Sequence, residues 1–490
     1  MTRTDWTRRE MLQRASGLMA GAAFLPNLQA PPSGGGSPAA SSAGMTTLSA
    51  YMAAARTRPL PGPVLEKVKH HVLDTCAAMI SGADLPPGRA AIDFARAYGG
   101  SPIATVAASG QRLGPIEAAM VNGVMAHADE TDDSHAPSVW HPGCAVVPAA
   151  LATGERFAID GQHFLRSVAL GYDIGSRVMA TLRAAGPQRY KSSHSIAGVF
   201  GAAAAAGCAA SLSPQQMRWL LDYTAQQSSG IAAWSRDVDH IEKGFAFGGM
   251  PARSGVTSAL LVQAGWNGID DIFSGENNFL LANAPEADPT HLATELLAEK
   301  LGDRYEVVRT NIKKWTVGSP IQAPLDALEI LLQRQRFSAD QVKEVLVRVS
   351  EGDVVDNRDM PDINLQHMMA VMLVDGTASF ASAHDKARMK DAAIVRHRAK
   401  VRLIPNDPQI VGRQAIVEVT LVDGTRLTEF VKAVRGTAEN PMTRDEVVEK
   451  CRDLIAPILG GPGWSRLSER VLNLERAGSV AELSGLLRRA

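Results

Sequence analysis

Aromatic residues are scarce in this sequence: Phe, Trp and Tyr make up 5% of its 490 residues, whereas alanine and glycine are abundant. Strands favour aromatic and β-branched residues, so this composition favours closely packed helices over a β-sandwich. The sequence also has no excess of charge of one sign, and its formal net charge is −1. No overall electrostatic field attracts nucleic acid or an anionic membrane, and we expect no nucleic-acid partner and no stable membrane association.

Cysteine is rare as well. The four cysteines, Cys76, Cys144, Cys208 and Cys451, are widely spaced, and three of them fall in apolar helical patterns. We expect buried thiols, and neither a disulfide framework nor a metal site. The sequence has no cysteine set for an iron–sulfur cluster and no glycine-rich phosphate loop. We therefore expect no cofactor.

The N-terminal residues 1–44 resemble a targeting segment and its linker. The pair Arg8-Arg9 precedes the weakly apolar run ASGLMAGAAFLP, and residues 28–44 are rich in Pro, Gly, Ser and Ala. This order is typical of a twin-arginine export signal, which predicts a periplasmic protein. The alternative is an amphipathic helix with a chance arginine pair in a cytoplasmic protein. The apolar run is too short to span a bilayer as a mature helix.

The length suggests roughly two to four domains. Apolar residues at three- and four-residue steps predict a helical domain over residues 45–304. Residues 305–440 contain segments of alternating polarity, which predict strands at 305–315 and 342–350. Further strands flank Asp423-Gly424, which predicts a hairpin turn of the primed type. The predicted fold is mainly α, with a large all-helical domain and a smaller α+β domain.

The last segment, residues 441–490, is expected to return to the helical domain. A capping box at Thr443 and Glu446 follows Asn440-Pro441 and predicts the start of a helix there.

A dense cluster of titratable residues lies between two apolar helical patterns at residues 119–150. Four carboxylates and three imidazoles fall within the stretch HADETDDSHAPSVWH, residues 127–141. Titratable groups held close together between buried helices should have perturbed pKa values, which marks a candidate site. A solvated acidic loop is one alternative. A metal site is another, with His127, Asp129, Glu130 and His141 as ligands, but their spacing matches no common zinc or calcium pattern.

The same stretch resembles the signature HALDFDDTH…HPS of the MmgE/PrpD family, which includes 2-methylcitrate dehydratases, cis-aconitate decarboxylases and an iminodisuccinate epimerase. The resemblance continues in order through YKSSHSIAGVFGAAAAAG, IEKGFAFGGMPARSG, NIKKWTVGSPIQAPLDAL and the closing LVDGT…ENPMTRDEVVEKCRDL. It implies that the α+β domain is a lid over the helical domain. It also implies a homodimer and a small-molecule carboxylate substrate.

The resemblance further implies a set of site residues. Residues expected to take part in catalysis are Glu130, Ser134, His141, His194 and Lys243, and those expected to bind substrate are Arg253, Lys313 and His367. Three of them depart from the family pattern, with Glu130 in place of Asp, Ser134 in place of Thr and His367 in place of Tyr. The segment after Lys243 is one residue longer than the pattern, and Ala246 lies near a position that is often His.

These residues predict a cofactor-independent lyase, similar to 2-methylcitrate dehydratase, that acts on a di- or tricarboxylic acid. Histidines and carboxylates would abstract a proton α to a carboxylate, and Lys or Arg would stabilise the developing enediolate. An epimerase or a decarboxylase of a related acid is an alternative. A catalytically silent periplasmic carboxylate-binding protein is another.

Overall fold

The computed structural model describes residues 41–489, and these residues form one compact unit. The predicted export signal and most of its linker lie outside the described residues. The first helix of the described residues, α2 (Ala43–Ala54), begins inside the predicted linker, where Ser42 caps it by accepting a hydrogen bond from the amide of Met45. No helix within residues 41–489 has the length and apolarity needed to cross a membrane.

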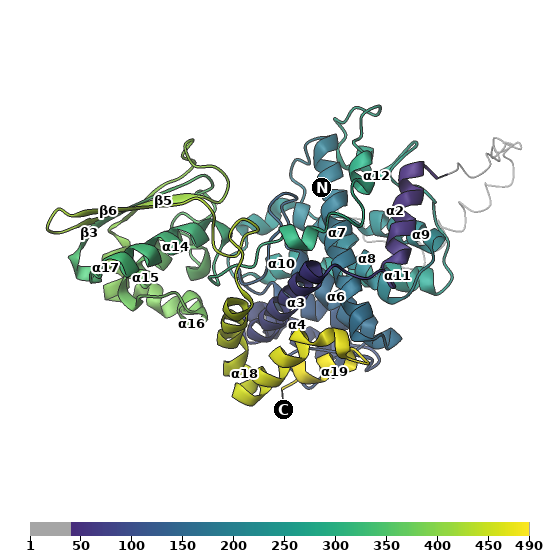
Figure 1. Cartoon of the computed structure of the whole chain (residues 1–490), viewed down its shortest axis with the longest axis horizontal. Helices are drawn as coiled ribbons and strands as arrows, with labels where there is room; N and C mark the ends of the chain where they lie inside the picture. Colours follow the sequence, from purple (N-terminus) through teal and green to yellow (C-terminus); the bar gives the residue numbers. More distant parts are fainter. Residues whose placement is uncertain (1–40, 490) are drawn as a thin grey trace, which may run out of the picture. The chain divides into compact units, whose positions relative to one another are not determined.

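The N-terminal part is helical, as predicted (Figure 1). Its longer helices are α3 (Gly62–Gly82), α4 (Pro86–Tyr98), α5 (Pro115–Ala126), α6 (Pro142–Phe157), α7 (Gly161–Ala185), α8 (Ser193–Ala209), α9 (Pro214–Gln227) and α11 (Met250–Gln263). Helix α8 lies in the centre and packs against α6, α7, α9 and α11. Its five consecutive alanines are fully buried, because their small side chains let the neighbouring helices approach closely.

Short elements connect these helices and follow them. They are the hairpin β1 (Ala104–Thr105) and β2 (Arg112–Leu113), the 3-10 helices η1 (Ala232–Arg236) and η3 (Glu306–Arg309), and the helical segments α10 (Ile241–Gly244), η2 (Phe245–Gly249), α12 (Phe279–Asn283) and α13 (Glu295–Ala298).

The second part is a four-stranded sheet with helices on one face and a separate apolar core. Its strands are β3 (Val342–Val349), β4 (Val401–Ile404), β5 (Ala415–Leu421) and β6 (Arg426–Val431). Their order in the sheet is β4-β3-β5-β6. Strands β3 and β4 are parallel, and the other pairs are antiparallel. Four helices belong to the same part: α14 (Ser319–Arg334), α15 (Leu365–Asp375), α16 (Phe380–His384) and α17 (Ala392–Arg398). Its short 3-10 turns are η4 (Ala339–Gln341), η5 (Pro361–Ile363) and η6 (Lys386–Lys390). We call this part the lid.

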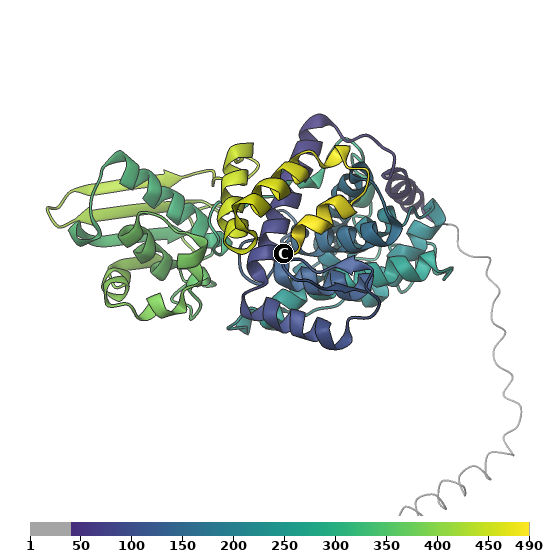
Figure 2. The same ribbon diagram turned by 90° about the horizontal axis from the view of Figure 1, so that it is seen from below.

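The chain ends in helices that pack on the N-terminal part (Figure 2). Helix α18 (Arg444–Leu472) begins at the predicted capping box of Thr443 and Glu446 and packs against α3. It is kinked at Gly460, whose φ of 72° is left-handed. The short elements η7 (Leu474–Arg476), α19 (Ala481–Ser484) and η8 (Gly485–Leu487) follow. All four cysteines are buried and free, as predicted.

Two local predictions were wrong. Residues 305–315 do not form a strand, because η3 covers Glu306–Arg309, and Asn311 makes only an isolated bridge to Ser134. The hairpin of β5 and β6 exists, but its turn is not of the primed type. Only Gly424 has a positive φ, of 90°, whereas a type I′ turn needs positive φ at both central residues.

Candidate active site

The loop between α5 and α6 carries the predicted cluster, and it is buried. His127 ends α5, Pro142 opens α6 directly after His141, and every residue from His127 to Asp133 is at most 5% exposed. The loop is tied down at Ser134, whose amide donates to the carbonyl of Asn311 (3.0 Å) and whose carbonyl accepts from the Asn311 amide (2.8 Å). The cluster is therefore not a solvated acidic loop.

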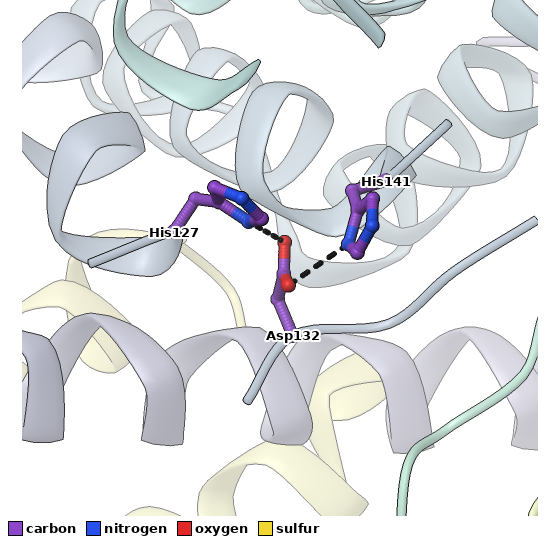
Figure 3. Close-up of side chains that lie close together, drawn as sticks. All are labelled: His127, Asp132 and His141. Carbon is purple, nitrogen blue, oxygen red and sulfur yellow. Dashed lines mark hydrogen bonds and ion pairs between the residues drawn. The ribbon is translucent and has the colours of Figure 1, made fainter. Parts of the chain in front are cut away.

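Asp132 lies between two histidines (Figure 3). Its Oδ2 is 2.9 Å from Nδ1 of His127, and its Oδ1 is 2.9 Å from Nδ1 of His141. Each Nδ1–H can donate to one carboxylate oxygen, which leaves Nε2 of each ring as the proton-accepting nitrogen. Burial alone would raise the pKa of Asp132, but the charges and hydrogen bonds of the two imidazoles hold it well below its ordinary value.

The two histidines differ in their surroundings. His127 is fully buried, and burial lowers its pKa to about 4 despite the charge of Asp132, so this ring is neutral at pH 7. Its Nε2 has no hydrogen-bond partner among residues 41–489. His141 lies on the wall of a cavity, so its Nε2 is the nitrogen that can meet a ligand.

Glu130 joins two lysines from different parts of the chain. Its Oε1 contacts Nζ of Lys243, and its Oε2 is 3.3 Å from Nζ of Lys313. Lys313 also donates to the main-chain carbonyl of Glu130 at 2.7 Å. Burial would raise the pKa of Glu130, but the two ammonium charges hold it well below its ordinary value, so it stays ionised.

An aromatic stack lies beside these groups. The rings of His194 and Phe247 are parallel with centroids 3.9 Å apart, and His194 lies 5.2 Å from His141. Trp234 meets both His194 and Phe247 edge-on. Burial and then the charges of His141, His127 and Lys243 lower the pKa of His194 well below its ordinary value, so it too is neutral.

A π-helical turn follows Lys243. Residues Phe245–Gly249 form η2, in which the amide of Met250 bonds to the carbonyl of Phe245. A π-helical turn accommodates one additional residue in a helix and is frequent at functional sites. It packs tightly on α5, because a Cβ on Gly248 would lie 2.0 Å from the carbonyl oxygen of Gly123. The turn thus fixes Lys243 and Phe247 next to the cluster.

The cavity has a volume of about 560 Å³ and lies between the helical part and the lid. Ser134, His141 and His194 line it from the helical part. Its cationic lining residues are Arg309, Arg413 and Lys432, and its anionic ones are Glu351 and Glu439. A carboxylate ligand of moderate size can therefore lie with one end at the histidines and the other at the lid.

Two histidine–carboxylate pairs join the lid to the helical part. Nε2 of His384 in α16 is 2.9 Å from Oδ2 of Asp129, and Nε2 of His240 is 3.1 Å from Oδ2 of Asp362 in η5. Burial would lower the pKa of His384, but the hydrogen bond and charge of Asp129, with a smaller effect of Asp362, raise it to about 9. The lid therefore touches the residue directly before Glu130.

Glu130 and Lys243 are not among the residues that line the cavity, and the three predicted substrate-binding residues also lie away from its wall. Lys313 is 3% exposed and lies behind Glu130. Arg253 is exposed on α11 over the ring of Phe245. His367 is fully buried in the lid, where neither ring nitrogen has a partner among the described residues and burial lowers its pKa to about 4. Their roles remain predictions.

Other groups at the site were not predicted from the sequence to take part in catalysis or substrate binding. Asp132 and His127 belong to the cluster, but sequence spacing does not show which carboxylate binds which imidazole. His240, His384 and the lid cations Arg413 and Lys432 are isolated in the sequence, and only the packing of the lid brings them to the site. No local sequence signal identifies them.

A metal ion is the other reading of the cluster. Ligand atoms of His127, Asp132 and His141 all lie within 4.8 Å of one another, so these three residues could hold one. Asp129 and Glu130, which the sequence offered as ligands, are bound to His384 and to the two lysines instead. The Nδ1–carboxylate distances are those of hydrogen bonds, and an ion between them would have to displace both protons.

The fold and the site define a two-part helical protein with a buried acid–base cluster facing a lid. Family models match the chain in the same two parts, the MmgE/PrpD N-terminal domain at residues 46–291 and the MmgE/PrpD C-terminal domain at residues 315–476. The chain belongs to the MmgE/PrpD family, which confirms the resemblance noted in its sequence.

Relatives of known name extend over nearly the whole chain. The cis-aconitate decarboxylase-like protein oryM of Aspergillus oryzae is 25% identical over 464 residues, which cover 87% of this chain and 94% of the relative. The cis-aconitate decarboxylase of Aspergillus terreus is 24% identical over 467 residues, with 88% and 93% covered. That of Homo sapiens is 24% identical over 447 residues, with 87% and 90% covered.

Proposed function

We propose that the protein is a lyase of carboxylic acids in which His141 exchanges a proton with a substrate carbon. The observation that carries this proposal is the Asp132–His141 pair at the cavity wall: Nδ1 of His141 lies 2.9 Å from Oδ1 of Asp132, and Nε2 has no hydrogen-bond partner within residues 41–489. A carboxylate that orients an imidazole also stabilises the imidazolium that forms when the ring accepts a proton. The names of the relatives support a carboxylate substrate.

In a dehydration, Nε2 of His141 accepts the proton from the carbon α to a substrate carboxylate. The electron pair of the C–H bond moves into that carboxylate to give an enediolate, and the Lys243 ammonium stabilises its charge. The pair then returns to form a C=C bond while the C–O bond to the β-hydroxyl breaks. The leaving hydroxide takes the proton from the imidazolium and departs as water.

A decarboxylation uses the same groups, but His141 donates a proton to the substrate instead of accepting one from it. The imidazolium of His141 delivers its proton to one carbon of a C=C bond, and the C–C bond breaks that joins a carboxylate to the carbon attached to the other end of this C=C bond. The electron pair of that bond forms a new C=C bond, and CO2 leaves. The sequence motifs favoured dehydration, whereas the three relatives are named for decarboxylation, and we propose decarboxylation as the second candidate.

Product analysis separates these outcomes. The protein is incubated in heavy water with a panel of acids that includes 2-methylcitrate and cis-aconitate, and products are identified by NMR. Loss of water indicates a dehydratase, and loss of CO2 indicates a decarboxylase. Deuterium incorporation without loss of a group indicates an epimerase. A binding protein without turnover raises its melting temperature with an acid but incorporates no deuterium.

We also propose periplasmic export, which rests on Arg8-Arg9 and the apolar run that follows. Replacing both arginines by lysine should leave full-length protein in the cytoplasm, and unchanged periplasmic activity would refute export.

We propose a homodimer, which rests on the family resemblance. Light scattering at micromolar concentration should give twice the chain mass, and a monomer would refute it.

A further inference from the structure

A short loop of the helical part, residues 235–240, lies between two aromatic residues that contact His194. Trp234 directly precedes the loop and meets the His194 ring edge-on, with ring centroids 5.4 Å apart. Phe247 follows the loop and stacks on the same ring, and the π-helical turn η2 fixes it on α5. Because His194 lines the cavity, the position of Trp234 affects the orientation of a histidine at the cavity wall.

The lid, and not the helical part, holds this loop. Of residues 235–240 only His240 is buried. Within residues 41–489, two hydrogen bonds join the loop to segments beyond residues 232–244. Nη2 of Arg358 donates to the carbonyl of Ser235 at 3.2 Å, and Nε2 of His240 is 3.1 Å from Oδ2 of Asp362. Arg358 and Asp362 both belong to the lid.

The pair of His240 and Asp362 is the buried one of these two anchors. Its side chains are 6% and 4% exposed, and Nδ1 of His240 has no hydrogen-bond partner among the described residues. The backbone of His240 is left-handed, with a φ of 63°, which is unfavourable for a residue other than glycine. Such a conformation persists only where the surrounding structure holds it, and the bond to Asp362 supplies that hold.

We propose that Asp362 of the lid is a positioning residue for His194. Through its hydrogen bond to His240 it holds the loop 235–240, and with the loop Trp234, against the ring of His194. The ring therefore keeps its orientation at the cavity wall only while the lid lies on the helical part. For its effect on turnover, this inference rests on the carboxylate-lyase function proposed above.

NMR of the histidine rings tests the coupling without a substrate. Protein labelled with 13C-histidine gives a ring Cε1–H signal for His194, which the spectrum of His194→Gln assigns by its absence. Neighbouring aromatic rings shift this signal, so it reports the positions of Trp234 and Phe247. Asp362→Ala should move and broaden the signal. Asp362→Asn should leave it in place, because the amide oxygen of asparagine can accept the same hydrogen bond from the imidazole.

Trypsin reports on the loop directly, because Arg236 is an exposed cleavage site within it. Cleavage of a folded protein requires local opening of the chain. Asp362→Ala and His240→Asn should each raise the rate of cleavage after Arg236 by about 10-fold, since each removes one hydrogen bond. Asparagine tolerates the left-handed backbone but is too short to reach the lid. The double variant should be cleaved no faster than the single ones, because both changes remove the same contact.

Turnover of an acid that the wild type converts should fall by about 10-fold or more in Asp362→Ala, mainly in kcat, because a misoriented group slows the reaction step. In Asp362→Asn it should fall by less than about 3-fold. Asp407→Ala is the matched control, because Asp407 pairs with Arg348 inside the lid at 3.2 Å and makes no hydrogen bond to the loop. It should lower the stability of the lid but leave the His194 signal, the cleavage after Arg236 and kcat unchanged.

The outcomes separate this inference from the lyase function. An unmoved His194 signal or unchanged cleavage after Arg236 in a folded Asp362→Ala overturns the inference, and so does a moved signal with undiminished kcat. If Asp362→Ala does not fold, the same measurements on His240→Asn, which leaves the lid intact, decide in the same way. A wild type that turns over no acid, together with the expected NMR and trypsin results, overturns the lyase function and leaves the positioning of His194 by Asp362 standing.

Discussion

Replacing Asp132 by asparagine should inactivate the enzyme without unfolding it. The carboxylate accepts one Nδ1–H from each of two histidines, whereas an asparagine amide offers one acceptor oxygen and one donor nitrogen. One imidazole can keep its bond, but the other must turn its lone pair toward the amide and place its proton on Nε2. If that ring is His141, the nitrogen facing the cavity can no longer accept a proton.

The expected loss of activity follows from the wrong tautomer and the lost negative charge. Substitution of the orienting carboxylate in a Ser-His-Asp triad by its amide lowers turnover by about 10⁴-fold, and general acid–base catalysis as a whole contributes about 10²–10⁴-fold. We expect turnover to fall by about 10²–10⁴-fold. The loss should be smaller at low pH than at high pH if the histidine must act as an acid.

The effect on stability should depend on pH. The pKa of Asp132 is lower in the folded than in the unfolded chain, so the carboxylate stabilises the fold above its unfolded pKa of about 3.9 and loses this contribution as pH falls through the folded pKa. One lost hydrogen bond to a charged group costs about 1.5–3 kcal/mol. The difference in unfolding free energy between wild type and Asp132→Asn should therefore be full at pH 7 and shrink below pH 4.

The assay is urea unfolding at several pH values together with a pH–rate profile on an acid that the wild type turns over. Asp326→Asn is a matched control, because Asp326 is a buried carboxylate of the lid that accepts hydrogen bonds from Trp315 Nε1 (2.9 Å) and the Arg435 amide (2.9 Å), away from His141. It should lose stability but keep the pH–rate profile. Full activity of a folded Asp132→Asn would refute the role given to the Asp132–His141 pair.

Three further predictions concern the lysine, the lid and the metal. Lys243→Met should raise KM and lower kcat together, since the ammonium binds the substrate and stabilises the enediolate; steady-state kinetics with KM unchanged would contradict substrate binding by Lys243. His384→Gln should destabilise the protein by about 1–3 kcal/mol at pH 6 and by less at pH 10. Because the pKa of His384 is raised, its protonated ring stabilises the fold fully below about pH 6.5, and this contribution is lost as pH rises through about 9. The same difference in unfolding free energy between wild type and His384→Gln at both pH values in urea unfolding would contradict the pair with Asp129. Incubation with a chelator should leave activity and melting temperature unchanged, whereas loss of both would assign a metal to His127, Asp132 and His141.

The sequence predicts the fold better than the pairing of charges. Helical periodicity and the capping box at Thr443 identified helices that the structure contains, because these signals are local. The prediction of a strand at residues 305–315 was wrong. The alternating pattern of this segment reflects its contact with the loop at Ser134 and not a place in a sheet. The prediction of a primed turn at Asp423-Gly424 was wrong, because the residue types do not show which of the two residues adopts a positive φ.

At the site, the sequence located the cluster but not its partners. A buried carboxylate requires a cation, and the two lysines that bind Glu130, Lys243 and Lys313, come from distant segments. The pair of Asp129 with His384 depends in the same way on how the lid packs. Such pairings are tertiary, and spacing along one segment contains no information about them.

The decisive measurement is NMR of a panel of di- and tricarboxylic acids incubated in heavy water with the wild type and with His141→Asn. We predict that the wild type releases water or CO2 from at least one acid, or exchanges a proton next to a carboxylate for deuterium. We expect His141→Asn, with unfolding free energy within about 1 kcal/mol of the wild type, to be slower by about 10²–10⁴-fold. An undiminished rate in a folded His141→Asn would refute the role of His141, and so would a wild type that gives neither product nor deuterium incorporation with any acid.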